Sequence, residues 1–235
     1  MYRAHGRHLM AIAFAFYLLL AAISVVLALL MDEFGAFIGA LIAFAGVFWV
    51  QGALVTAIED VRDGRADLTV RETIAHIRPQ LNRLSFAALG ILIGVIIAVG
   101  LIAIGFLLFV IPGIIALVAF VIFAVRWSLL VPVIMLERKT VFGSLDRSQE
   151  LVSGHTGHAF LVLLASLGFI IAVAIVVGLV LAPFDFPRWV DETIRTIVSG
   201  TLIAPFAALA LTVMYYRLRA VKEPVHEPAP GPLAA

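Results

Sequence analysis

Long apolar stretches separated by short polar connections dominate the pattern of hydrophobic and polar positions along the chain. A helix needs about 20 mostly apolar residues to cross the ~30 Å hydrocarbon core of a bilayer, at ~1.5 Å per residue. The longest stretch, 84–136, has room for two such helices joined by a turn at Pro112-Gly113. The sequence therefore predicts an all-α, polytopic integral membrane protein with six transmembrane helices. These predicted spans cover residues 9–31, 34–58, 84–111, 113–136, 159–181 and 197–216.

The predicted domain organisation is simple. Residues 1–219 form one transmembrane domain, and residues 220–235, rich in proline and without apolar periodicity, form a disordered cytoplasmic tail. The first span follows Arg3 and Arg7, as the apolar segment of a secretory signal would. Its apolar run is longer than the ~7–15 residues of a signal peptide, so we expect it to be retained as an anchor.

Two polar connections have the pattern of amphipathic helices. The first follows Thr69, with apolar residues at helical spacing and Glu72 placed for a capping box. The second follows Thr140. Its expected apolar face contains Val141, Leu145 and Val152, and Ser144, Arg147 and Glu150 point away from that face. We predict two interfacial helices on the cytoplasmic membrane surface. Their similar Thr-Val starts also suggest a repeat of span, surface helix and span.

Basic residues are distributed very unevenly about the predicted spans. Every Lys and Arg except Arg126, Arg188 and Arg195 falls on the side that holds both termini. Lys and Arg remain on the cytoplasmic side of membrane proteins, so both termini are predicted to be cytoplasmic. The prediction is a multi-pass protein of the cell inner membrane, with the lipid bilayer, and anionic lipids at its cytoplasmic face, as partners.

The composition argues against several classes of protein. With 63% hydrophobic and 13% charged residues, the chain is far more apolar than soluble domains, which are roughly 45–50% apolar and about 25% charged. A net charge of +1 argues against nucleic-acid binding. The sequence contains no cysteine and no zinc-protease, nucleophile-elbow or phosphate-loop motif. We expect no enzymatic activity, no metal site and no cofactor.

Arg126 is the one ionisable residue well inside a predicted span. It lies ten residues before Leu136, hence ~15 Å from the cytoplasmic end of that span. An Arg at this depth costs about 2.5–3.5 kcal/mol on insertion scales and faces the bundle interior or a wet cavity. Gln51 is the best polar partner at similar depth. The pair indicates either a site for an anionic headgroup or solute, or an Arg that locks two helices together.

Small residues recur every four positions in two of the predicted spans. Gly35, Gly39 and Ala43 form one such row, and Gly90, Gly94 and Ala98 form another. Rows of this kind allow helix backbones to approach closely in a membrane. We expect close packing within the chain, with a dimer interface as the alternative.

One set of polar, glycine and aromatic residues follows a recognisable order along the second half of the chain. Its members are Arg126-Trp127, Pro132, Glu137, Gly143, Arg147-Ser148, Leu151 and Gly154, with Tyr215-Tyr216-Arg217-Leu218-Arg219 at the end of the last span. With these residues the chain resembles the membrane domain of the glycerophosphoryl diester phosphodiesterase family and related uncharacterised bacterial proteins. The resemblance covers roughly residues 50–219.

The resemblance concerns the membrane region alone. In that family the membrane region is fused to a soluble catalytic barrel, whose His-Arg-Gly motif and acidic metal ligands are absent from this sequence. It therefore implies no phosphodiesterase activity here. It draws attention to a candidate cytoplasmic interface cluster of Glu137, Arg138 and Arg147, in which Arg147 pairs with Glu137 or with a lipid phosphate.

Two functions remain open from the sequence. The first is a non-enzymatic integral membrane protein that acts as a scaffold, a partner subunit or an envelope-biogenesis factor, with a membrane protein partner or a homo-oligomer as its assembly. The second is a small transporter or lipid-handling protein with its site near Arg126 and Gln51. A polar cavity that reaches Arg126 would favour the second function.

Overall fold

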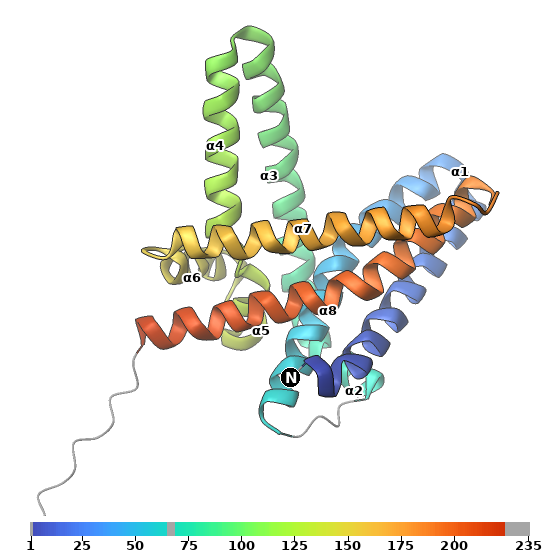
Figure 1. Cartoon of the computed structure of the whole chain (residues 1–235), viewed down its shortest axis with the longest axis horizontal. Helices are drawn as coiled ribbons and strands as arrows, with labels where there is room; N and C mark the ends of the chain where they lie inside the picture. The colour runs from blue at the N-terminus through green and yellow to red at the C-terminus, as the bar shows by residue number, and fades with distance from the viewer. Residues whose placement is uncertain (1, 65–68, 224–235) are drawn as a thin grey trace, which may run out of the picture.

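The computed structural model describes residues 2–64 and 69–223, and every regular element in these ranges is helical (Figure 1). Five helical stretches are long and apolar enough to cross a membrane, which confirms an all-α fold of the membrane type. The elements are α1 (Tyr2–Arg62), α2 (Val70–Ile77), the 3-10 turn η1 (Arg78–Gln80), α3 (Leu81–Leu108), α4 (Val110–Arg126), α5 (Leu130–Glu137), α6 (Val141–Val152), α7 (Thr156–Leu181) and α8 (Arg188–Lys222).

The 61 residues of α1 form a helical hairpin rather than one rod. Helical geometry fails at Met31 and Asp32, where Asp32 has φ 49° and ψ −132°. Beyond this break the chain returns along itself, and Ser24 donates a 3.3 Å hydrogen bond to the carbonyl of Gly39. A Cβ atom at Gly39 would lie 3.1 Å from the Ser24 Cα, so the Gly35–Gly39 row packs closely within the chain, as predicted.

α3 and α4 form a second hairpin, with its turn earlier than predicted. The chain turns at Phe109, which is extended (φ −157°, ψ 147°), and not at Pro112-Gly113. Pro112 lies in the first turn of α4, where its missing N–H has no intrahelical partner to lose. At the tip the helices touch, because a Cβ atom at Gly105 would lie 2.7 Å from the Gly113 nitrogen.

The predicted span 113–136 is wrong as a single helix. α4 ends at Arg126, residues 127–129 form a turn, and α5 begins at Leu130. Arg126 therefore lies at a helix end, and not ten residues inside a continuous helix. α5 is apolar because it is enclosed by protein: Leu130, Val133 and Ile134 are all buried.

α7 and α8 form the third hairpin, in which Phe169 and Phe206 pack with ring centroids 4.2 Å apart. α8 is longer than the predicted span 197–216 because it begins at Arg188 and continues to Lys222. The predicted tail boundary after residue 219 therefore falls inside a helix. The rest of the predicted tail, 224–235, lies outside the described residues.

The two predicted amphipathic segments are helical and begin in the same way. The Thr69 and Thr140 side chains each accept a 3.3 Å hydrogen bond from the backbone N–H three residues later. In α6 the predicted faces are correct only in part. Val152 is buried and Glu150 is exposed, as predicted, but Ser144 and Arg147 are also buried, while Val141 and Leu145 are only half-buried. Two of the three predicted polar residues of α6 thus face protein, and not water or lipid headgroups.

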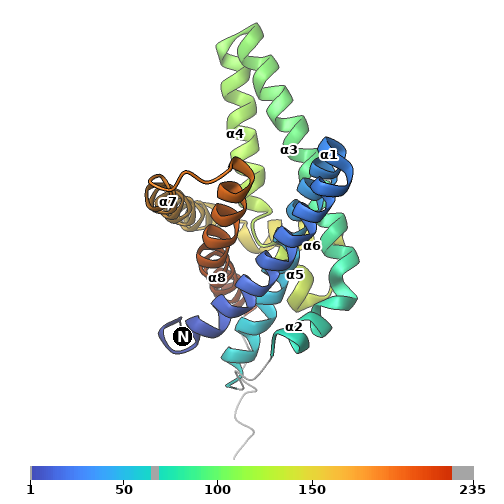
Figure 2. The ribbon, with the colours of Figure 1, turned by 90° about the vertical axis from the view of Figure 1, so that its right-hand side faces the viewer.

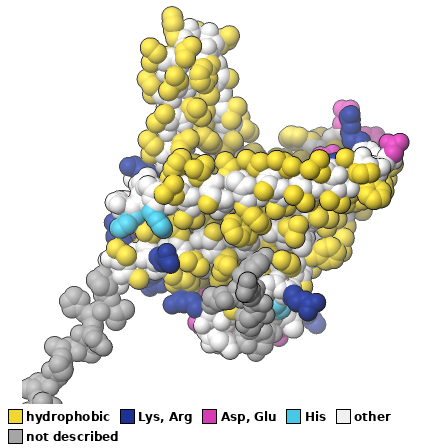
Figure 3. Space-filling model, viewed as in Figure 1, with side chains coloured by type: hydrophobic (Ala, Val, Ile, Leu, Met, Phe, Trp, Pro, Cys, Tyr) yellow, Lys and Arg dark blue, Asp and Glu magenta, His cyan; other side chains and the backbone are white. Residues whose placement is uncertain are grey.

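The α1 and α7–α8 hairpins lie side by side, and the α3–α4 hairpin diverges from them (Figures 1 and 2). α1, α7 and α8 form the larger body, and α5 and α6 lie at its base beside the ends of α4 and α8. The α3–α4 hairpin projects from this base at a steep angle to α7 and α8 and is called the arm below. Hydrophobic side chains cover the visible face of the arm (Figure 3), and Leu107 near its tip is 86% exposed.

Candidate functional site

A dense polar cluster lies where α5, α6 and α8 meet, and Arg147 is at its centre. The Arg147 guanidinium contacts three carboxylates: Glu137 at 3.1 Å, Glu150 at 2.9 Å, and Glu223. Glu137 also accepts a 2.9 Å hydrogen bond from the Tyr215 hydroxyl. We call the five residues Glu137, Arg147, Glu150, Tyr215 and Glu223 the Arg147 cluster. It joins α8 to the consecutive helices α5 and α6, since Tyr215 lies 78 positions after Glu137 and Glu223 lies 76 positions after Arg147.

Burial makes the central pair of this cluster energetically important. The Arg147 side chain is 10% exposed and that of Glu137 is 12% exposed. Burial alone would lower the pKa of the Arg147 guanidinium, but its hydrogen bonds to Glu150, Glu137 and Glu223 outweigh this effect and raise that pKa. Hydrogen bonds from Arg147 and Arg219 hold the pKa of the Glu223 carboxyl below its usual range. Arg147 and Glu223 therefore both carry their charges at neutral pH.

Local structure between α5 and α6 explains how Glu137 and Arg147 meet. Arg138 ends α5 in the left-handed conformation (φ 53°), so the chain reverses within a few residues before Thr140 caps α6. The carbonyl of Arg138 accepts a 2.6 Å hydrogen bond from Arg83 of α3. The Lys139 ammonium lies 3.1 Å from the second oxygen of Glu137. The turn thus directs α6 back along α5.

Two of the three predicted cluster residues come together in the structure. Glu137 and Arg147 form the predicted ion pair. Arg138 contributes its backbone carbonyl to the turn, and within the described residues its side chain makes no ion pair. Lys139 occupies the position beside Glu137 that the sequence analysis assigned to Arg138.

Ser148, next to Arg147, fills the break between α4 and α5. In a continuous helix the Leu129 N–H and the Arg126 carbonyl would bond within the helix. Here the Leu129 N–H donates to the Ser148 hydroxyl at 3.2 Å, and that hydroxyl donates to the Arg126 carbonyl at 2.7 Å. Ser148 is fully buried, so one side chain satisfies both backbone groups of the break.

Within the described residues, Arg126 and Gln51 form no hydrogen bond with each other. Gln51 lies on α1, whose main neighbours are α8, α2, α3 and α5. Arg126 is the last residue of α4, and its side chain is half-buried without an ion pair in the part of the chain that the structure describes. The carbonyl of Arg126, and not its guanidinium, makes the contact with α6.

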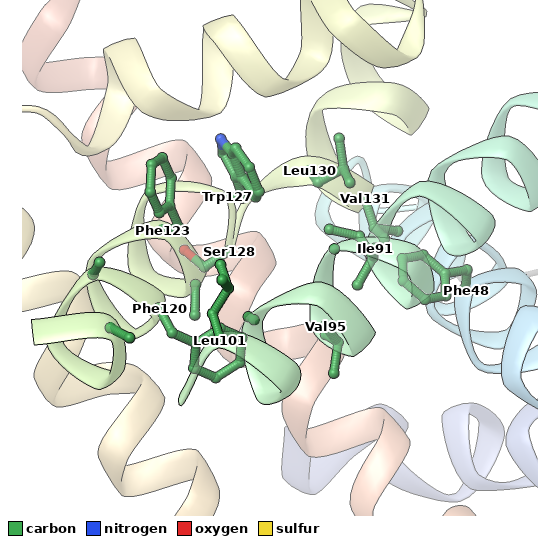
Figure 4. Close-up of a pocket in the computed structure, with 15 residues that line it drawn as sticks. Phe48, Ile91, Val95, Leu101, Phe120, Phe123, Trp127, Ser128, Leu130 and Val131 are labelled. Atoms are coloured by element: carbon green, nitrogen blue, oxygen red, sulfur yellow. The ribbon is translucent and has the colours of Figure 1, made fainter. Parts of the chain in front are cut away.

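An apolar cavity of about 510 Å³ lies between α3 and α4 above the α4–α5 turn. Figure 4 shows Phe123, Trp127 and Ser128 at one side of this space, with Ile91 and Val95 of α3 at the other. The Ser128 hydroxyl donates back to the Val125 carbonyl at 2.8 Å, so it has its own partner. The cavity is near Arg126 in the sequence but is not the polar cavity that a solute transporter requires.

Sequence reasoning missed most of the partners of Arg147. Glu150 was assigned with Arg147 to a polar face directed away from the protein, and Glu223 was placed in the disordered tail. Tyr215 belongs to the closing motif of the resemblance, which was the only signal that could have pointed to it. Among the described residues no group of three or more His, Asp or Glu side chains is arranged to hold a metal ion.

No family model, no curated protein and no solved structure matches the chain. The resemblance to the membrane domain of the phosphodiesterase family stays a prediction. The chemistry of the site has to be judged from its geometry. In the Arg147 cluster each charged group faces an opposite charge or a hydrogen-bond donor, an arrangement suited to holding helices together.

Proposed function

We propose that this protein is a non-enzymatic integral membrane protein that acts as a scaffold or partner subunit, with the arm as its contact surface in the bilayer. The observation that carries this proposal is the projection of the arm from the base, with both of its helices exposed along most of their length. Such a surface is apolar enough to insert, and in a membrane it is open to lateral contact.

The proposed topology has six spans in the cell inner membrane, with both termini in the cytoplasm. It requires the arm to align with α7 and α8 on insertion, because helices at a steep angle to one another (Figure 1) cannot all cross one ~30 Å hydrocarbon core. The break at Met31 and Asp32 supports two spans within α1, and the four other long apolar helical stretches supply one each. α2 and α6 then lie at the cytoplasmic surface near anionic lipids, although α6 directs Ser144 and Arg147 toward the protein. The charge asymmetry of the sequence supports this orientation.

The absence of cysteine from the natural sequence makes this topology testable with single-cysteine variants. We expect Asp185→Cys and Ile111→Cys to react with a membrane-impermeant maleimide on intact cells. Gln149→Cys on α6 should react only after permeabilisation. All three residues are exposed. Protection of Ile111→Cys from both sides would show that the arm is re-entrant and would reduce the number of spans to four.

The function of the arm is testable by site-specific photo-crosslinking in the membrane. A photoreactive amino acid at Ile96 on α3 or Ile115 on α4 should give a discrete protein adduct, since these side chains are 62% and 63% exposed. The matched control is Ile175 on α7, which is 56% exposed but belongs to the body, and it should give no such adduct. Adducts with lipid alone at Ile96 and Ile115 would contradict the scaffold proposal and favour lipid handling.

A further inference from the structure

We propose that the cavity between α3 and α4 binds one acyl chain of an anionic phospholipid, and that the guanidinium of Arg126 binds its headgroup phosphate. This inference rests on the proposed insertion of the arm into the bilayer. It assigns to the protein a lipid site with a defined chain pocket and a defined cationic group, and it replaces the pairing of Arg126 with Gln51.

The shape and lining of the cavity fit an acyl chain. Its volume of about 510 Å³ is within the roughly 300–1,000 Å³ of small-molecule sites. The walls are small, branched aliphatic and aromatic residues, and no carboxylate, Lys or Arg is among them. Water needs polar partners to occupy a buried space, and here nearly the whole surface is apolar. In a bilayer the hydrocarbon chains are the available apolar molecules.

The arm keeps this space open through its own geometry. The helices touch at the tip, where Gly105 meets the backbone at Gly113. Farther down, Gly94 lines the cavity, and a Cβ atom placed on it would meet nothing within 4 Å. The row of Gly90 and Gly94 therefore does not pack within the chain, contrary to the sequence prediction. The two helices enclose a gap between their small-residue faces.

Arg126 is placed to bind the phosphate of the same lipid. α4 has 17 residues, so Arg126 lies about 25 Å from the tip of the arm at ~1.5 Å per residue, near one edge of a ~30 Å hydrocarbon core. At about 100° per residue it falls on the flank of the α4 face that lines the cavity. Its neighbour Trp127 lines the cavity, and Trp is enriched at membrane interfaces. Arg binds phosphate through two parallel hydrogen bonds.

Trp127 provides a direct readout of this site. In a Trp49→Phe, Trp189→Phe background Trp127 is the only Trp. The protein is reconstituted in vesicles of phosphatidylcholine with a minor fraction of phosphatidylglycerol. In separate samples one or the other lipid carries bromine, a fluorescence quencher, on its acyl chains. We expect brominated phosphatidylglycerol to quench Trp127 with about a fivefold preference over brominated phosphatidylcholine, the effect of one basic group on an anionic lipid. Arg126→Gln should abolish the preference, and Arg71→Gln on the exposed surface of α2 should retain it.

Filling the cavity tests the chain pocket separately from the headgroup. Gly94→Leu places a side chain in the open space and should reduce quenching by both brominated lipids. Gly100→Leu is the matched control, because Gly100 is on the same helix with nothing within 4 Å of a Cβ atom, but does not line the cavity. Both changes replace Gly within a helix by a better helix former, so folding is retained.

The outcomes separate this inference from the proposed function. Equal quenching of Gly94→Leu and Gly100→Leu would overturn the chain pocket, and a preference that survives Arg126→Gln would overturn the headgroup contact. Acrylamide, an aqueous quencher, reports on insertion. Strong quenching of Trp127 by acrylamide and none by brominated lipid would overturn membrane insertion of the arm as well. A protein adduct at the arm without lipid preference at Trp127 would leave the scaffold function intact and remove the lipid site.

Discussion

Arg147→Met is expected to lower the free energy of unfolding by about 3–5 kcal/mol, because it removes one partner of a buried ion pair and leaves the other behind. Met retains most of the length and apolar contact of the Arg side chain, so the effect comes from lost charge. Glu137 is 12% exposed and keeps only Lys139 and Tyr215 as partners. The measurement is the unfolding curve in mild detergent titrated with a denaturing detergent, followed by far-UV circular dichroism.

A matched control distinguishes the loss of a buried Arg charge from the loss of an exposed one. Arg219 also pairs with Glu223, at 3.1 Å, but its side chain is 47% exposed. Arg219→Met is expected to change stability by less than about 1 kcal/mol, since exposed ion pairs contribute little. A similar loss from both variants would contradict the assignment of Arg147 as the centre of the cluster.

Removing the buried charges together should restore part of the stability. In the double variant Arg147→Met, Glu137→Gln, the neutral amide still accepts the Tyr215 hydrogen bond and no buried carboxylate is left without its main partner. Replacing both members of a buried pair is often nearly neutral. We expect the double variant to be more stable than Arg147→Met alone. If it is less stable, the two residues act independently and the buried-pair explanation fails.

The α6 helix shows which information the sequence contains and which it does not. Thr140 and the apolar spacing predict the helix and its start, because capping and periodicity are local properties. The inward direction of Arg147 depends on Glu223 at the end of α8, 76 positions later in the sequence. A pattern of polar residues is the same whether the partner is water, a lipid headgroup or a buried carboxylate. Without that distant partner, the pattern placed Ser144 and Arg147 on the wrong face, while Val152 and Glu150 lie as predicted.

The candidate site was predictable only to the extent that local chemistry determines it. The pairing of Glu137 with Arg147 follows from a helix that ends at an acid and a second helix that returns beside it, and it is confirmed. Glu223 could not be assigned, because the prolines that follow it favoured disorder from residue 220 onward. The cavity could not be predicted from the sequence either. Its small residues match a close-packing motif, and only the divergence of α3 from α4 shows that they enclose a space.

The α4–α5 break is the largest departure from the predicted fold, and one distant side chain completes its hydrogen bonding. The turn residues Trp-Ser-Leu contain no Gly or Pro, but Pro132 has no N–H to donate to the Ser128 carbonyl. This local signal for a break was not used in the prediction of one span over 113–136. A break in an apolar environment leaves backbone groups without partners, and each such group costs about 1–3 kcal/mol unless something else bonds to it. Ser148 supplies both bonds from 22 residues beyond Arg126. The turn is therefore stabilised both by its own residues, among which the Leu130 N–H donates to the Trp127 carbonyl, and by Ser148 of α6.

Ser148→Ala is expected to destabilise the protein by about 2–4 kcal/mol, because it leaves both the Leu129 N–H and the Arg126 carbonyl buried without that hydroxyl. The loss should appear in the detergent unfolding curve and as a shift in Trp127 emission, since Trp127 lies in the turn. Ser153→Ala is the matched control, because its hydroxyl bonds to the Glu150 carbonyl at an exposed position. Ser148→Thr retains the hydroxyl and should preserve more stability than Ala if its methyl group can be accommodated. If Ser148→Ala unfolds like the wild type and its Trp127 emission is unchanged, the break does not depend on Ser148, and α4 and α5 form this turn for another reason.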